Sequence, residues 1–178
     1  MAIVRLNHAV LFVGDAERSA RFYEDVLGFR RLDLLDAIPG AVFLQAQGST
    51  NDHDLGLFSV GESGDRLPTG GRTVGLYHLA WEVDTLEELG RLAEKLKGAG
   101  ALVGASDHGT TKSLYGRDLD GIEFEVQWMV PLDLLDTQAL AASRIISPLD
   151  LESEKARYGP TTLGGVGKSS PASVAKPA

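Results

Sequence analysis

Two histidines and one glutamate have the residue types that metal chemistry requires. His8 and His78 lie 70 positions apart, each at the centre of a β-rich run, and Glu125 lies in a later apolar run. A glutamate in such a strand is costly to bury unless it is paired or bound to a metal. Two histidines and one carboxylate form the facial triad of non-haem Fe(II) oxygenases, which leaves positions open for substrate and O₂. We therefore predict one divalent metal ion, Fe(II) or alternatively Mn(II), at these three residues.

A histidine in an apolar strand is more often a hydrogen-bonded core residue than a metal ligand. Here two histidines occupy equivalent positions of a repeat, and a glutamate lies in a strand where a third ligand is expected, which favours the metal site. The chain has no cysteine, so any metal must be held by His, Asp or Glu.

The positions of these residues follow from an internal repeat. Segments 4–29 and 74–100 each begin with a β-rich run around the histidine, pass an Asp into a helical pattern and end at a Gly. A repeat of this length implies two copies of one supersecondary unit. Strand-like runs follow each helix, at 30–35, 41–47 and 54–60 in the first copy and at 101–105, 112–117 and 123–129 in the second. Each copy therefore reads β-α-β-β-β.

Capping residues support both helices. Asp15 is the predicted N-cap of the first, and Asp84 of the second, with Glu87 completing a capping box. Gly28 ends the first helix, and Gly98 or Gly100 ends the second. The predicted apolar faces are Ala16, Ala20, Tyr23 and Leu27 in the first helix, and Leu86, Leu89, Ala93 and Leu96 in the second.

We predict an α+β protein. Two tandem βαβββ modules, at about 3–60 and 73–130, form one paired domain over residues 1–131, with a linker at 61–72. A C-terminal helical extension at 132–158 includes a helix over 132–146. The composition from Gly159 onward, rich in Gly, Ser, Pro, Ala and Lys, predicts a disordered tail at 159–178.

The formal net charge is −8 and basic residues are not concentrated anywhere, which gives nucleic-acid binding little support. No stretch reaches the roughly 20 apolar residues of a membrane span. MAIVRLNHAV lacks the charged region and apolar core of a signal peptide, so we expect a cytoplasmic protein without a membrane partner.

The motifs LNHAVLFV, YHLAWEV and SLYGRDLDGIEFEV resemble the vicinal oxygen chelate superfamily, which includes glyoxalases, extradiol dioxygenases and bleomycin-resistance proteins. The resemblance covers residues 3–130. It implies a cup-shaped mixed sheet, with helices outside, around a metal held by His8, His78 and Glu125. In the first copy the counterpart of Glu125 is Leu55 or Leu57. Glyoxalase I-like enzymes place an acidic fourth ligand there, so the resemblance favours an oxygenase with an open site.

The two other histidines lie in motifs similar to those of extradiol dioxygenases. His53, in NDHDL, resembles the histidine that assists where dioxygen reacts. His108 and Tyr115 resemble the His and Tyr that contact the catecholate. A histidine in a polar loop is often simply solvated, and Tyr115 in a strand often belongs to the core. The resemblance nevertheless implies a single-domain type I extradiol dioxygenase, similar to catechol 2,3-dioxygenases, acting on a small-molecule catechol and O₂.

A one-domain enzyme of this class is short, and we expect it to gain stability by forming a homo-oligomer. Two other functions stay open: a metal-dependent glyoxalase, lyase or epimerase of the same superfamily, or a drug-sequestering binding protein. The first does not require His53 and Tyr115, and the second often lacks the ligand triad. Phe43, Trp81 and Trp128 are candidates for lining the pocket.

Overall fold

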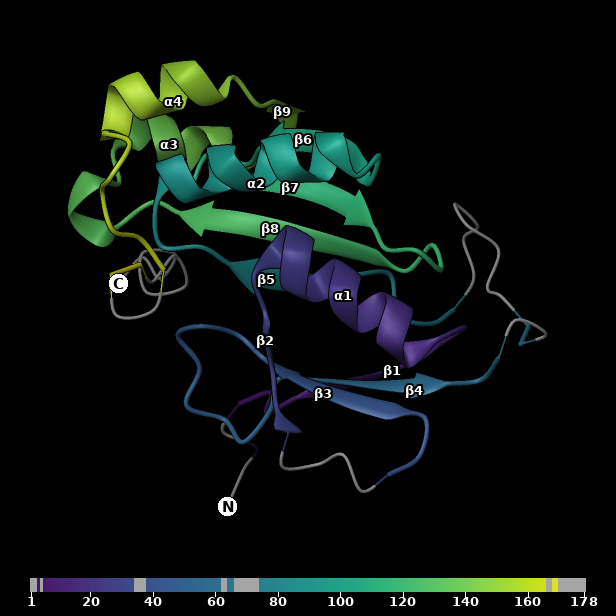
Figure 1. Cartoon of the computed structure of the whole chain (residues 1–178). Helices are drawn as coiled ribbons and strands as arrows, with labels where there is room; N and C mark the ends of the chain where they lie inside the picture. The colour runs from purple at the N-terminus through teal and green to yellow at the C-terminus, as the bar shows by residue number, and fades with distance from the viewer. Residues whose placement is uncertain are drawn as a thin grey trace. The chain divides into compact units, whose positions relative to one another are not determined.

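The computed structural model describes residues 3, 5–33, 38–61, 64, 65, 74–165, 168 and 169 (Figure 1). The chain divides into two compact units, the first formed by Met1–Arg72 with Asp118–Gly121 and the second by Thr73–Arg117 with Ile122–Ala178. Most of the predicted linker at 61–72 and the end of the tail at 170–178 lie outside the described residues.

The first unit is one βαβββ module with a mixed sheet. Its strands lie in the order β1-β4-β3-β2, where β1 is parallel to β4 and the other neighbours are antiparallel. The elements are β1 (Ala9–Val13), α1 (Ala16–Leu27), β2 (Arg30–Arg31), β3 (Ala41–Gln45) and β4 (Leu55–Ser59). This confirms the predicted order of elements in the first copy.

Helix α1 begins and ends where the sequence predicts. The Asp15 side chain accepts a hydrogen bond from the Arg18 N–H, and Gly28 closes the helix in the left-handed region at φ 77°. Ala16, Ala20 and Tyr23 are buried as predicted, and α1 packs on β3 and β4 (Figure 1). Leu27 is only half-buried, because the buried face of the helix turns toward Phe22 and Val26 instead.

The turn Asp118–Gly121 belongs to the first unit although it is far along the chain. The Tyr23 hydroxyl donates to Asp118 Oδ2 at 3.1 Å, and Asp120 Oδ2 accepts from the Gly14 N–H at 3.1 Å. Burial, and then the charge of Asp118, raise the pKa of Tyr23 well above its ordinary range. These contacts hold the start and the middle of α1 to the turn.

The second unit repeats the same topology. Its sheet has the order β5-β8-β7-β6-β9, with β5 parallel to β8 and the other neighbours antiparallel. The repeated elements are β5 (Leu79–Glu82), α2 (Leu86–Gly98), β6 (Leu102–Asp107), β7 (Thr111–Arg117) and β8 (Glu123–Met129). The α+β class and the two βαβββ modules are confirmed. In the described residues each module carries a mixed sheet of its own.

The N-cap of α2 was predicted one residue too early. Thr85, not Asp84, accepts from the Glu88 N–H, at 3.2 Å. The Asp84 carbonyl instead accepts from the Gly164 N–H and from Trp128 Nε1. All four residues of the predicted apolar face are buried, and Gly100 adopts the left-handed conformation, at φ 66°.

The C-terminal part folds onto the second unit. It contains a 3-10 turn (Leu132–Leu134), α3 (Thr137–Ala142), β9 (Ser147–Pro148) and α4 (Leu151–Tyr158). The helix predicted over 132–146 is therefore shorter than expected, and α4 was not predicted as a separate helix. The described residues after Gly159 fall in the stretch expected to be disordered. Yet the Glu87 N–H donates to the Pro160 carbonyl and the Ser169 hydroxyl to the Met129 carbonyl.

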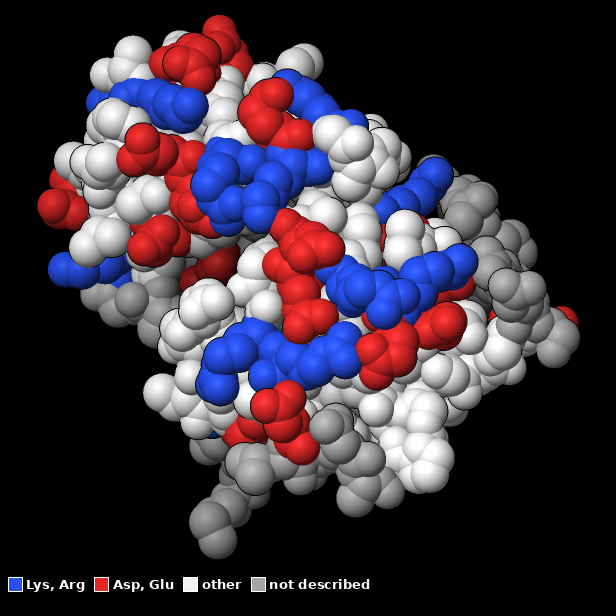
Figure 2. Space-filling model, in the orientation of Figure 1, with Lys and Arg blue, Asp and Glu red and all other residues white. Residues whose placement is uncertain are grey.

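Charges of both signs are interleaved on one face of the molecule (Figure 2). On the face seen in Figure 2, Lys and Arg residues alternate with Asp and Glu rather than forming a continuous basic area. No helix among the described residues is both long and apolar enough to cross a bilayer.

Candidate metal centre

Two of the three predicted ligands, His78 and Glu125, meet in the second unit. Ala80 pairs with Glu125 across β5 and β8, and strand alternation places His78 on the same face as Ala80. His78 Nε2 lies 3.1 Å from Glu125 Oε2, and Glu125 is 8% exposed. Phe124 and Val126 are buried on the opposite face, as the alternation predicts.

This distance fits two different situations. Two ligands bound at right angles to one metal, each about 2.1 Å from it, are about 3 Å apart. A hydrogen-bonded His–Glu pair has the same separation. His78 Nδ1 is buried and has no hydrogen-bond partner among the described residues. His78 Nε2 and Glu125 Oε2 are thus at a separation that suits two ligands of one divalent metal, whereas Nδ1 lacks, among these residues, the hydrogen-bonded neighbour that metal-bound histidines usually have.

Tyr115 and His108 lie on the same face of this sheet. Tyr115 pairs directly with Glu125, and its ring centroid is 6.0 Å from that of His78. His108 Nε2 is 2.8 Å from the Tyr115 hydroxyl, so the two share a hydrogen bond. Burial, and then the charge of Glu125, raise the pKa of Tyr115 and keep its phenol protonated. The predicted substrate contacts are thus neighbours of each other and of two predicted ligands.

In the first unit the predicted ligand His8 is in contact with His53. Their ring centroids are 4.3 Å apart. His8 Nδ1 lies 2.8 Å from Asn7 Oδ1, a contact in which the ring N–H donates to the amide oxygen. This leaves Nε2 as the free electron pair, the arrangement found in metal-bound histidines whose second nitrogen is held by a neighbour. Sequence reasoning missed Asn7, although it adjoins His8.

His53 is held in place rather than left in solvent. It is 9% exposed and its ring packs at 5.1 Å against Phe43. The adjacent Asp54 carboxylate accepts from the Ala46 N–H and the Ser49 hydroxyl, both at 2.8 Å. These bonds fix the loop that carries His53, and Nδ1 of His53 lies 3.2 Å from Asp52 Oδ2.

The first-unit counterpart of Glu125 is Gly56, not Leu55 or Leu57. Val10 pairs with Gly56 in the way that Ala80 pairs with Glu125, because the register of the two sheets differs by one residue from the sequence offset. Leu55 and Leu57 are fully buried on the opposite face. Glycine has no side chain that could bind a metal. The predicted residue was therefore wrong, but the prediction that no acidic residue occupies this position is correct.

The three aromatic candidates for the pocket differ in their positions. Phe43 pairs with Gly56 and contacts His53, so it lies on the histidine face. Trp128 is fully buried, pairs with Lys112 and contacts Tyr158, and Trp81 pairs with Val126. Both tryptophans therefore belong to the opposite face and not to the candidate site.

The described residues contain no group of three or more His, Asp or Glu side chains placed to hold a metal ion. His8 belongs to the first unit, and His78 and Glu125 to the second. The structure thus brings together His8 with His53, and His78 with Glu125, Tyr115 and His108. The complete triad stays a prediction.

Comparison with known proteins gives a consistent family. The model of the Glyoxalase/Bleomycin resistance protein/Dioxygenase superfamily matches residues 5–126. A crystal structure of a glyoxylase/bleomycin resistance protein/dioxygenase domain from Frankia sp. EAN1pec has the same fold, with a TM-score of 0.56 and 24% identity, covering 71% of this chain and 92% of that one.

Three curated relatives carry different activities in their names. A manganese-dependent 2,3-dihydroxybiphenyl 1,2-dioxygenase of Geobacillus genomosp. 3 is 27% identical over 72% of this chain and 38% of its own length. A catechol-2,3-dioxygenase of Bacillus subtilis is 32% identical over 68% and 40%. A lactoylglutathione lyase of Neisseria meningitidis is 32% identical over 68% and 88%. The match thus spans about two fifths of each dioxygenase but most of the lyase.

Proposed function

The chain belongs to the Glyoxalase/Bleomycin resistance protein/Dioxygenase superfamily, and within it we propose a metal-dependent extradiol dioxygenase that opens the ring of a catechol. His8, His78 and Glu125 would hold the metal, with Fe(II) first and Mn(II) as the alternative. The proposal rests on one observation. On a single face of β5, β7 and β8, the His78–Glu125 pair lies beside Tyr115 and His108, which are hydrogen-bonded to each other.

The chemistry assigns a separate task to each side chain. When bound, the metal supplies a Lewis acid that lowers the pKa of a diol hydroxyl and provides sites for the diol and O₂. Tyr115 is protonated and donates a hydrogen bond to the catecholate oxygen. His108 orients the Tyr115 hydroxyl, to which it is hydrogen-bonded. His53 acts as a general acid–base group and transfers a proton at the position where dioxygen reacts. One ring C–C bond beside the hydroxyls breaks and both atoms of O₂ enter the product, so no external reductant is required.

The comparisons support this proposal in two ways. Two of the relatives are dioxygenases by name, and one of them is manganese-dependent. In addition, Gly56, the first-unit counterpart of Glu125, offers no side chain that could serve as a fourth protein ligand. The first point favours a dioxygenase, and the second favours a site with three protein ligands over one with four.

Oxygen consumption tests the proposal. The purified protein is loaded anaerobically with Fe(II) or Mn(II) and mixed with catechol, 2,3-dihydroxybiphenyl and substituted catechols. We expect O₂ uptake together with a yellow ring-fission product. His78→Ala should lose both, whereas Glu123→Gln, on the same strand face but paired with Arg117, should keep them. No uptake across the panel with either metal would reject the dioxygenase.

The length of the lactoylglutathione lyase match favours a second candidate, an isomerase or lyase of the same superfamily. S-lactoylglutathione, assayed with Ni(II), Co(II), Zn(II) and Mn(II), separates the two activities. Turnover of this thioester without O₂ uptake would select the second candidate. A drug-sequestering protein is distinguished by metal content, because without the triad's chemistry it should retain no metal after gel filtration.

We also propose that the chain forms a homo-oligomer and that its substrate is a small molecule. Light scattering of the active protein tests this assembly. Full activity in a monomer would reject it.

A further inference from the structure

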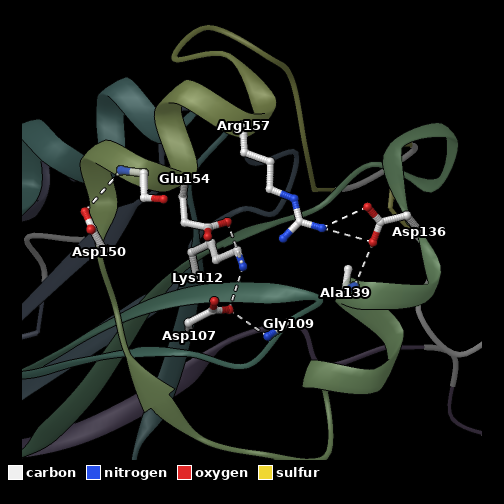
Figure 3. A network of polar contacts seen from close by, with 9 residues as sticks. Asp107, Gly109, Lys112, Asp136, Ala139, Asp150, Glu154 and Arg157 are labelled. Carbon is white, nitrogen blue, oxygen red and sulfur yellow. Dashed lines mark hydrogen bonds and ion pairs between the residues drawn. The ribbon is translucent and has the colours of Figure 1, made fainter.

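Lys112 is a buried cation whose two partners come from different parts of the chain. Its side chain is 1% exposed, and Nζ lies 2.5 Å from Asp107 Oδ1 on β6 and 2.9 Å from Glu154 Oε2 on α4 (Figure 3). A buried ammonium group is strongly destabilising if one partner is removed. The C-terminal helix therefore supplies one of the two charges that hold Lys112 inside the second unit.

This charge cluster lies directly behind His108 and Tyr115. Asp107 pairs with Lys112 across β6 and β7. Alternation turns the next residue, His108, and the third residue after Lys112, Tyr115, to the other face of the sheet. Asp107 Oδ1 also accepts from the Gly109 N–H at 2.7 Å. One carboxylate thus holds both Lys112 and the turn that carries His108.

Two other C-terminal elements contact the same turn. Strand β9 pairs with β6 at Asp107 and Ser147. Helix α3 approaches Gly109 so closely that a Cβ there would lie 2.3 Å from the Ala139 carbonyl oxygen. Gly109 has φ +74°, which also favours glycine.

Helices α3 and α4 are themselves tied together. Arg157 on α4 donates to both carboxylate oxygens of Asp136, at 3.0 and 2.8 Å, and Asp136 caps α3 by accepting from the Ala139 N–H (Figure 3). We call α3, β9 and α4 together the C-terminal clamp. Its three elements contact the β6–β7 turn at Gly109, Asp107 and Lys112.

We propose that the C-terminal clamp positions the His108–Tyr115 pair for substrate, with Glu154 as its principal positioning residue. This rests on the proposed function, in which that pair contacts the catecholate. Glu154 touches neither substrate nor metal; it acts through Lys112 and Asp107. A loosened turn should therefore weaken substrate binding, because the pair would no longer be held where it contacts the catecholate.

Amide hydrogen exchange of the metal-free protein tests the clamp without reference to activity. Glu154→Gln removes the charge but keeps the size and one acceptor oxygen. Glu152→Gln is the matched control, because Glu152 lies on the same helix, is 82% exposed and pairs only with Lys155 among the described residues. We expect Glu154→Gln to speed exchange at 108–111 by about tenfold, as loss of one bond to a charged group implies, with α1 unchanged. Exchange equal to that of Glu152→Gln would overturn the proposal.

Steady-state kinetics supply the second readout. With a catechol that the wild type cleaves, Glu154→Gln should raise KM by about tenfold and lower kcat less, with metal content unchanged. A lower kcat at unchanged KM would contradict a positioning role. If the wild type cleaves no catechol, the proposed function fails, while the exchange result still decides whether the clamp holds the turn.

A less disruptive variant covers the case in which Glu154→Gln loosens the whole second unit. Arg157→Gln breaks the bond to Asp136 at the surface, and Lys97→Gln, which breaks an exposed pair with Glu94, is its control. Faster exchange at 108–111 in Arg157→Gln alone would support the clamp. Equal exchange in both variants would overturn it.

Discussion

Replacing Glu125 by Gln removes one negative charge 3.1 Å from His78 Nε2 and keeps the size of the side chain. The variant separates the two situations that this distance allows. A metal ligand should lose metal affinity. A partner in a simple His–Glu hydrogen bond should lose only stability.

The two outcomes differ in size as well as in kind. Loss of one hydrogen bond to a charged group costs about 1.5–3 kcal/mol of unfolding free energy. For a chain of this length that lowers Tm by about 3–12 °C, with or without metal. A metal at 100 times its Kd adds about 2.7 kcal/mol to the wild type, a rise of about 5–11 °C. We expect Glu125→Gln to lose most of that rise.

Thermal unfolding with and without Mn(II), followed by metal analysis after gel filtration, measures both quantities. Glu123→Gln is the control, because Glu123 lies two residues away on the same strand face and pairs with Arg117 at 2.7 Å. Its metal-dependent rise should equal that of the wild type. If Glu125→Gln keeps the full rise and the same metal content, Glu125 is a hydrogen-bonding residue and the triad is wrong.

His53→Ala should keep the metal but slow ring cleavage by about 10²–10⁴, the range for acid–base groups; full activity would remove its role. Gly56→Glu should lower kcat by adding a fourth protein ligand, whereas Gly56→Ala, whose Cβ meets Phe43 at an ordinary 3.4 Å, should not. Tyr23→Phe should cost about 1.5–3 kcal/mol at pH 7. Because the pKa of Tyr23 is raised on folding from its ordinary 10.0, the folded wild type holds the phenol proton more tightly, so its stability falls above pH 10. Denaturant titrations should therefore show the gap to Tyr23→Phe narrowing there.

The repeat and its two helices could be predicted because they depend on local signals. Asp15 and Gly28 lie at the ends of α1, and the apolar spacing of Leu86, Leu89 and Leu96 matches the buried face of α2. Asp84 and Thr85 are both good caps, so sequence alone could not choose between them. The choice follows from the Asp84 carbonyl, which accepts from residues far along the chain.

Strand register was less predictable. The offset between the two copies is constant through the first strand and the helix. It predicted Leu55 or Leu57 as the first-copy counterpart of Glu125. Backbone pairing selects Gly56 instead, because Val10 and its partner Gly56 are 46 positions apart whereas Ala80 and its partner Glu125 are 45 positions apart. A shift of one residue exchanges the two faces of a strand, so this error concerned the face and not only the position.

Helix α4 was missed because its packing depends on polar side chains. Its residues LESEKARY show little apolar periodicity, and its attachment uses Glu154 toward Lys112 and Tyr158 toward Trp128. Asp150 as a cap, with acidic residues first and basic residues last, was the available signal. In the candidate site, the sequence indicated His8, His78 and Glu125 as ligands, but the support of His8 by Asn7 required the structure.

The turn at Asp118–Gly121 has a consequence for synthesis of the chain. Its contacts with Gly14 and Tyr23 join residues 106 and 95 positions apart. During translation the first βαβββ module emerges long before this turn, so the Tyr23 hydroxyl has no Asp118 to bond until that residue is made. Long-range closures of this kind form late. The first module is therefore incompletely stabilised until the second half of the chain supplies this turn. If the ribosome stalls between the modules, α1 lacks its contacts with the turn.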